Sequence, residues 1–67
     1  MSVAKTIEIQ ASSSKGFEDA VNKGIKQAAK SLKGITGAWV SEQKVVVEDG
    51  EISSYRVTMR VTFLLDD

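Results

Sequence analysis

An alternating pattern in the last third of the chain constrains the fold more than any other feature of the sequence. From Tyr55 to Phe63 every second residue is apolar, and the positions between them are arginine or threonine. Period-two alternation with many β-branched and aromatic residues is typical of a strand that buries one face. We therefore expect a long strand over about residues 52–65, with its apolar side chains packed against another element.

A tight turn is expected to join this strand to the one before it. Asp49 and Gly50 lie between two apolar runs, and an Asp-Gly pair favours a two-residue type I′ turn because both central residues need a positive φ. An uninterrupted register from this turn pairs Glu48 with Glu51, Val47 with Ile52, Val40 with Met59 and Trp39 with Arg60. The same register assigns one face of the second strand, expected at about residues 35–48, to Gly37, Trp39, Ser41, Gln43, Val45 and Val47, opposite Thr62, Arg60, Thr58, Arg56, Ser54 and Ile52.

The first half of the chain predicts one strand and one helix. Alternation over residues 3–11 indicates a first strand of about eight residues. The serine run at residues 12–14 is expected to start the helix, with one hydroxyl accepting a hydrogen bond from the first turn. Apolar residues at steps of three and four follow over residues 17–32 and form one stripe. Gly24 lies on that side, where it would permit a close approach, and Gly34 is expected to end the helix.

The order strand, helix, strand, strand predicts an α+β fold, with one amphipathic helix packed on a three-stranded antiparallel sheet. Residues 1–67 are expected to form a single domain. A helix of about 20 residues is roughly 30 Å long, whereas a strand of about 14 residues is roughly 45 Å long. The hairpin must therefore extend past the helix, carrying Val45, Val47 and Ile52 on an uncovered arm. A chain this small usually needs extra support, so we expect these three residues to form an interface in a homo-oligomer.

The composition excludes several classes of function. The chain has no cysteine and no histidine, so it has no disulfide framework and no thiol or imidazole for catalysis or zinc binding. Nine basic and nine acidic residues balance, which argues against a nucleic-acid binder. No stretch resembles a signal peptide or a membrane span. We expect a cytoplasmic protein that is not an enzyme and has neither nucleic acid nor membrane as a partner.

Three stretches together resemble the dodecins, small strand-helix-strand-strand proteins that assemble as hollow dodecamers. They are the helix opening Ser12-Ser13-Ser14-Lys15-Gly16-Phe17-Glu18-Asp19-Ala20, the turn Asp49-Gly50 and the ending Tyr55-Arg56-Val57-Thr58-Met59-Arg60-Val61-Thr62-Phe63. The resemblance covers nearly the whole chain. It implies a dodecin-like homododecamer, which would cover the hairpin arm and would bind or store a small ligand or ion.

The resemblance also implies where a flavin would bind, and the sequence departs from the family there. Flavin-binding dodecins stack the isoalloxazine ring on a tryptophan at the start of the second strand and bind its polar edge with a glutamine in the third strand. These positions fall on Gly37 and Arg56, so the chain lacks the usual flavin platform. Trp39 lies two residues later on the same face, opposite Arg60. These four residues are the candidate ligand-binding residues.

Trp39 leaves two interpretations open. Its ring could stack on an aromatic anion such as a nucleotide or a flavin. Alternatively, it could be the cross-strand cation–π partner of Arg60 and serve only the fold.

The pattern Val40-Ser41-Glu42-Gln43 resembles instead a flavin-less branch described as calcium dodecins. Calcium takes about six to eight oxygen ligands, and the acidic candidates, none in an EF-hand spacing, are Glu42, Glu48, Asp49, Glu51, Asp66 and Asp67. They could converge where symmetry brings copies together, or they could be ordinary surface charges, so the metal ligands stay unassigned and no cofactor is obligatory. Three functions remain open: a shell that sequesters a small ligand or ion, a flavin-binding dodecin that stores riboflavin or FMN with Trp39 in a rearranged pocket, and a purely structural assembly module.

Overall fold

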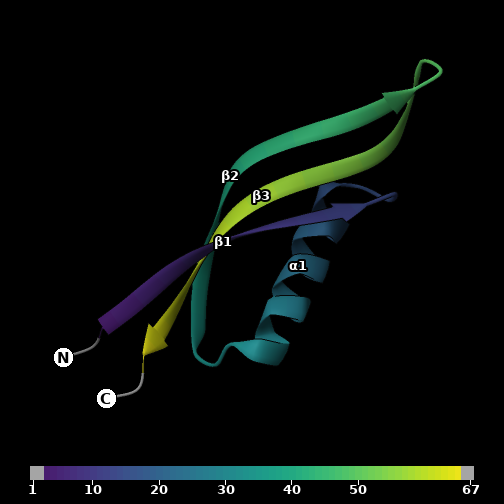
Figure 1. Cartoon of the computed structure of the whole chain (residues 1–67). Coiled ribbons are helices and arrows are strands. Elements are labelled where there is room, and N and C mark those ends of the chain that lie inside the picture. The colour runs from purple at the N-terminus through teal and green to yellow at the C-terminus, as the bar shows by residue number, and fades with distance from the viewer. Residues whose placement is uncertain (1–2, 66–67) are drawn as a thin grey trace.

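The computed structural model describes residues 3–65, which form four elements in the expected order (Figure 1). Strand β1 (Val3–Ser13) is followed by helix α1 (Phe17–Ser31), strand β2 (Ile35–Glu48) and strand β3 (Glu51–Leu65). The strands form one antiparallel sheet in the order β1-β3-β2, so β3 lies in the centre. The predicted α+β fold, with one helix on a three-stranded antiparallel sheet, is confirmed.

The apolar face of β3 forms the core because this strand has a neighbour on each side and the helix over it. Val57, Met59 and Val61 are buried, and Ala20 of α1 forms one cluster with Val57 and Met59. Half-buried residues surround the cluster: Ile9, Ala11, Phe17, Val21, Ile25 and Val40. Helix α1 lies over β1 and β3 (Figure 1). The opposite face of the sheet, called the outer face below, has no helix or strand over it within residues 3–65.

Gly24 permits the close approach that its place on the apolar stripe predicts. The residue is buried within α1. A Cβ atom at this position would lie 2.6 Å from Cε of Met59 and 3.0 Å from Cβ of Ala11. Both distances are shorter than the optimal separation of carbon atoms, so a side chain here would displace Met59 or push α1 away from the sheet.

The turn at Asp49 and Gly50 forms as expected, with φ angles of 52° and 77°. Because the turn is the predicted one, the register next to it agrees with the sequence-based prediction. It agrees again farther along the hairpin because two register shifts between Val47 and Val40 cancel each other. The confirmed pairs are Glu48–Glu51, Val47–Ile52, Val40–Met59 and Trp39–Arg60.

Between these pairs the register shifts, and the uninterrupted register predicted for the hairpin is wrong there. One shift lies between Val40 and Glu42, which leaves Ser41 without a partner in the ladder. The hydroxyl of Ser41 donates a hydrogen bond to the carbonyl oxygen of Thr58, 3.2 Å away. A second shift, just before Val47, restores the register set by the turn. The extra residue is Ser41 of β2 in the first shift and Ser53 of β3 in the second. A bulge inserts a single residue in one strand, and the alternation from Tyr55 to Phe63 that predicts β3 gives no sign of either.

The shifts change which residues share a face. The observed pairs are Gln43–Val57, Lys44–Arg56 and Val45–Tyr55. Val57 is buried under α1, and the ring of Tyr55 meets that of Phe17 at 5.2 Å. Gln43 and Val45 therefore belong to the helix side of the sheet, and the prediction that they share a face with Trp39 is wrong. Lys44 takes the place opposite Arg56.

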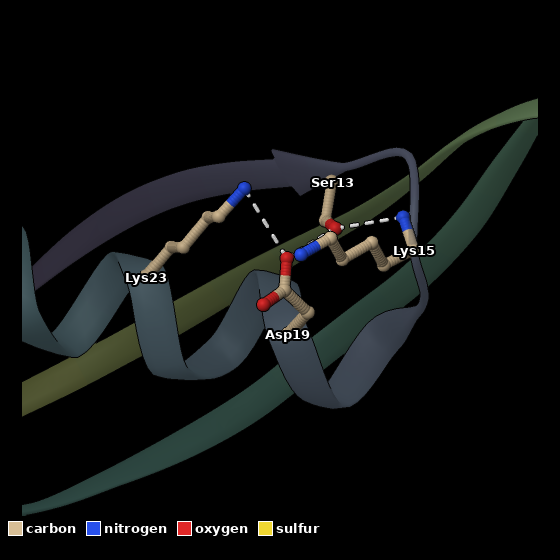
Figure 2. A network of polar contacts seen from close by, with 4 residues as sticks. All are labelled: Ser13, Lys15, Asp19 and Lys23. Atoms are coloured by element: carbon tan, nitrogen blue, oxygen red, sulfur yellow. Dashed lines mark hydrogen bonds and ion pairs between the residues drawn. The ribbon is translucent and has the colours of Figure 1, made fainter.

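The helix begins later than the serine run predicts. Strand β1 continues through Ser13, and α1 begins at Phe17, after Gly16, with no side-chain hydrogen bond capping its first turn. The hydroxyl of Ser13 instead accepts a hydrogen bond from the N–H of Lys15 at 2.9 Å and donates one to the carboxylate of Asp19 at 2.5 Å (Figure 2). The prediction of a serine cap is therefore wrong, because Ser13 joins the end of β1 to the first turn of α1.

The helix also ends earlier than predicted. Its last residue is Ser31, which gives 15 residues rather than about 20. Gly34, with φ 76°, lies in the connection to β2, and its carbonyl accepts a hydrogen bond from the N–H of Leu64 at 3.0 Å. Gly34 therefore turns the chain into the sheet and does not end the helix. Within residues 3–65 no helix has the length and apolar character needed to cross a membrane.

Asp19 makes the stability of the fold depend on pH. The hydrogen bond from Ser13 and the contact with Lys23, 3.2 Å away, hold the pKa of Asp19 below its ordinary value of 3.8. A carboxyl group with a lowered pKa in the folded state adds stability above its unfolded pKa, and this contribution is lost as the pH falls through the folded pKa. We expect Asp19→Asn to melt at a lower temperature than the wild type at neutral pH, with a difference that closes in melts at successively more acidic pH.

The matched control for this prediction is Glu18→Gln, which removes an exposed carboxylate from the same helical turn. It should melt close to the wild type across the same pH series. A deficit in Asp19→Asn that stays constant at every pH would contradict the role given to the carboxylate.

The hairpin extends well past the helix, as predicted. Helix α1 has 15 residues and is roughly 22 Å long, whereas β3 has 15 residues and is roughly 50 Å long. The longest dimension of the molecule is 52 Å, and the tip of the hairpin projects beyond α1 (Figure 1). Residues 45–54, called the hairpin arm below, carry the exposed side chains of Val45, Val47 and Ile52.

Candidate functional site

Four cross-strand rows, each with one residue from every strand, form the middle of the outer face of the sheet. The β3 residues between the buried Val57, Met59 and Val61 face the opposite side of the sheet from α1. Each of these outward-facing residues has one residue of β1 and one residue of β2 as its neighbours. The rows are Thr6–Thr62–Gly37, Glu8–Arg60–Trp39, Gln10–Thr58–Glu42 and Ser12–Arg56–Lys44. All four predicted ligand-binding residues, Gly37, Trp39, Arg56 and Arg60, thus lie on the outer face.

Trp39 and Arg60 form the cation–π pair that the register predicts. The guanidinium carbon of Arg60 lies 5.3 Å from the centroid of the Trp39 ring. Trp39 is 61% exposed, so the pair is worth about 0.5–1 kcal/mol. The exposed ring is still available to a ligand, and both interpretations of Trp39 agree with its position.

Gly37 leaves the neighbouring row without an aromatic ring. A Cβ atom at Gly37 would have no other group within 4 Å, and the two threonines of the row share a hydrogen bond of 3.2 Å between their hydroxyls. The ring of Trp39 belongs to the next row. A planar ligand therefore finds open space at Gly37 and no surface on which to stack.

A groove of about 510 Å³ lies at Arg56 and spans all three strands. It is lined by Gln10, Ala11 and Ser12 of β1, Arg56, Val57 and Thr58 of β3, and Glu42, Gln43 and Lys44 of β2. Gly37, Trp39 and Arg60 are not part of this lining. The structure thus divides the four predicted residues between two places, the Trp39–Arg60 pair and this groove, called the Arg56 groove below.

Most of the Arg56 groove was missed by sequence reasoning. The alternation of the first strand separates Gln10 from its apolar residues, and pairing that strand with β3 would have placed Gln10 opposite Thr58, in the row next to Arg56. Ser12 was expected at the start of the helix, and it lies beside Arg56 because β1 continues through Ser13. Lys44 is different, because it faces Arg56 only after the register shift at Ser41. No residue pattern in the sequence marks that shift.

The charges of the Arg56 groove are two cations and one carboxylate. Lys44 and Arg56 lie directly opposite each other, and Glu42 belongs to the adjacent row. Within residues 3–65 neither cation has a carboxylate oxygen within 4.0 Å, since the ion pair found there joins Lys23 to Asp19. The groove therefore offers positive charge and hydroxyl and amide groups, which suits the binding of an anion.

The acidic side chains do not come together in one chain. Within residues 3–65 no three acidic residues are close enough to hold a metal ion. Glu42 lies on the outer face, whereas Glu48, Asp49 and Glu51 lie at the tip of the hairpin. The other two calcium candidates, Asp66 and Asp67, lie outside the described residues.

Comparisons with known proteins place the chain in a family. The family model described as Dodecin matches residues 3–66. A search of curated proteins found no significant match. Among solved structures, the dodecin from Streptomyces davaonensis is 30% identical, with a TM-score of 0.94 over 98% of this chain and 97% of that chain. A mutant of the Thermus thermophilus dodecin is 25% identical, with a TM-score of 0.95 over 100% of both chains.

A third similar structure is that of a protein described as binding calcium. The calcium dodecin from Mycobacterium tuberculosis, described as a calcium-chelating antigen with a novel calcium-binding site, is 32% identical to this chain. The two align with a TM-score of 0.83 over 96% of this chain and 91% of that one. The family model and these structures cover nearly the whole sequence and share its strand-helix-strand-strand order, and on this evidence the chain belongs to the dodecin family.

Proposed function

We propose that this dodecin assembles into a homododecamer in the cytoplasm and binds and sequesters a small molecule or an ion on the outer face of its sheet. The hairpin arm is the observation that carries the proposal. Val47, at 58% exposure, stands with Val45 and Ile52 on an arm that α1 does not cover. An apolar strand pair left open in this way favours association, so a second copy of the chain is the natural cover.

The role proposed is binding and not catalysis. The chain has no histidine or cysteine, so two of the commonest acid, base and nucleophilic groups are missing. The outer face instead presents an exposed ring, two arginines and a groove lined by polar side chains. These groups recognise a ligand by stacking, charge and hydrogen bonding.

Light scattering coupled to gel filtration tests the assembly. We expect a mass near twelve times the 7.2 kDa of one chain. A stable monomer at micromolar concentration would contradict the proposal. An absorption spectrum and a native mass measurement of protein purified without added cofactor separate a ligand-binding shell from a purely structural module, which would carry nothing.

Calcium is the ion to examine first because a similar protein is described as binding it. The described residues of one chain do not gather three acidic side chains. A calcium site in this protein would therefore need carboxylates from more than one copy, for example Glu42 or the acidic residues at the tip of the hairpin arm.

Flavin is the second candidate, favoured by the exposed ring of Trp39. We expect weak binding, with a dissociation constant for riboflavin and FMN no tighter than on the order of tens of micromolar, because Gly37 supplies no ring to stack on. Arg56, in place of an amide, can only donate hydrogen bonds, so recognition of the polar edge of the flavin changes as well. Titration of either flavin, followed by quenching of its fluorescence, measures the affinity.

The control for the flavin titration is Trp39→Ala. It should leave this weak affinity almost unchanged if Trp39 serves mainly its contact with Arg60. Submicromolar binding that is lost in Trp39→Ala would establish the rearranged flavin pocket instead.

A further inference from the structure

The pair Lys44–Arg56 is the least expected feature of the outer face. The two cations lie directly opposite each other on neighbouring strands, where side chains start only about 5 Å apart at Cβ and like charges repel. The register shift at Ser41 creates this pairing, since the uninterrupted register would have placed an uncharged glutamine opposite Arg56. The fold therefore brings together two positive charges that a simpler hairpin would keep apart.

No carboxylate in the described part of the chain relieves this repulsion. Neither Lys44 nor Arg56 has an acidic oxygen within 4.0 Å. Glu42 lines the same groove but belongs to the next row, opposite Thr58. Water hydrates an exposed pair of cations and weakens their repulsion. Because Lys44 and Arg56 lie side by side in a groove, a doubly charged anion bound between them would neutralise both charges.

The rest of the groove supplies uncharged hydrogen-bonding groups. Ser12 flanks Arg56 on the side away from Lys44, so the row reads hydroxyl, guanidinium, ammonium. Gln10 and Thr58 follow in the adjacent row and also line the groove. Guanidinium groups bind phosphate oxygens through two parallel hydrogen bonds, and ammonium groups bind them as point charges.

We infer that the Arg56 groove binds the phosphate group of a small molecule between Lys44 and Arg56, with Ser12 donating a further hydrogen bond. The inference rests on the proposed function, because it names the class of ligand bound on the same face of the sheet. It differs from a stacking site because it requires no ring. All the residues involved belong to one chain, so the groove does not need a neighbouring copy to be complete.

Calorimetric titration of the purified, assembled protein with inorganic phosphate, at an ionic strength held constant with sodium chloride, tests the inference. We expect a dissociation constant of about 1 mM or tighter. Arg56→Gln and Lys44→Gln should each weaken phosphate binding at least about tenfold, since each removes one of the charge-assisted contacts. Lys26→Gln, which removes an exposed positive charge from α1 on the other side of the sheet, is the matched control and should bind phosphate like the wild type.

Melting temperatures give an independent test, because a substitution that abolishes phosphate binding should raise the stability of the phosphate-free protein. Without phosphate, Lys44→Glu replaces the repelling pair by an attracting one and should melt at a higher temperature than the wild type. Phosphate should raise the melting temperature of the wild type, because it binds the folded state, and should leave that of Lys44→Glu unchanged. A second titration with glycerol phosphate shows whether the natural ligand is a phosphate ester or free phosphate. If glycerol phosphate binds as tightly as inorganic phosphate, the ligand is a phosphate ester. If only inorganic phosphate binds, the ligand is the free ion.

Two results would overturn the inference. One is a wild type that binds phosphate no better than chloride, and the other is equal loss of binding in Lys26→Gln and Arg56→Gln. Light scattering on the same samples keeps the proposals apart. A dodecamer without phosphate binding overturns the inference and leaves the assembly intact, whereas a monomer whose phosphate binding depends on Lys44 and Arg56 overturns the assembly and upholds the groove.

Discussion

Val47→Asp is expected to break the assembly apart. In one chain Val47 is 58% exposed on the hairpin arm, so the substitution should barely disturb the fold of the monomer. In a dry contact between copies it would bury an unpaired carboxylate, at a cost above about 3 kcal/mol for each copy. Gel filtration with light scattering should show dissociated chains or irregular aggregates in place of one uniform species.

Val3→Asp is the matched control, because Val3 is 52% exposed on β1 and lies outside the hairpin arm. It should assemble like the wild type. If Val47→Asp also assembles and melts like the wild type, then the hairpin arm is solvated and the predicted interface of Val45, Val47 and Ile52 is misplaced.

Met59→Ala is expected to lower the free energy of unfolding by about 2–5 kcal/mol. Met59 is fully buried in the central strand, under α1, and its truncation leaves a cavity between the sheet and Gly24. Denaturant unfolding at a fixed protein concentration measures the change, since the stability of an oligomer depends on concentration. Met59→Leu, which nearly conserves volume, should cost less than about 1.5 kcal/mol.

The double substitution Gly24→Ala with Met59→Ala should recover part of this loss. The new Cβ would meet Cε of Met59 at 2.6 Å in the wild type, whereas in Met59→Ala this contact is gone and the 3.0 Å approach to Cβ of Ala11 remains. Alanine also favours the helix over glycine by about 1 kcal/mol. Gly24→Ala should therefore stabilise the Met59→Ala protein more than the wild type, and a purely additive result would show that the two residues do not share the contact.

The sequence predicted the parts of the fold that depend on repeating patterns. The alternation of β3, the apolar stripe that includes Gly24 and the turn at Asp49 and Gly50 each follow from local rules, and together they determine the order and the pairing of the elements. The excess length of the hairpin over the helix follows from the same element lengths. It is larger than expected because α1 ends at Ser31.

Features produced by single residues were not predictable in this way. The bulge at Ser41 requires one extra residue in one strand, and nothing in the alternation of the partner strand records it. The start of α1 was placed too early because a serine run can extend a strand as well as cap a helix, and Ser13 does the former. The Arg56 groove depends on the bulge, so sequence reasoning found Arg56 on the correct face without its neighbour Lys44.

The central position of β3 decides when the molecule can fold. Strands β1 and β2 do not pair with each other, and each needs β3, which follows both of them in the chain. During synthesis on the ribosome, β1 and α1 therefore stay unpacked at first, because β3, the pairing partner of β1, leaves the ribosome after β2. Pairing of Val3 with Leu65 closes a loop that spans the entire described chain, and contacts of such long range slow folding. The contacts between β2 and β3 are local in sequence, so we expect this hairpin to form first. Strand β1 then pairs with β3, and α1 packs on the completed sheet.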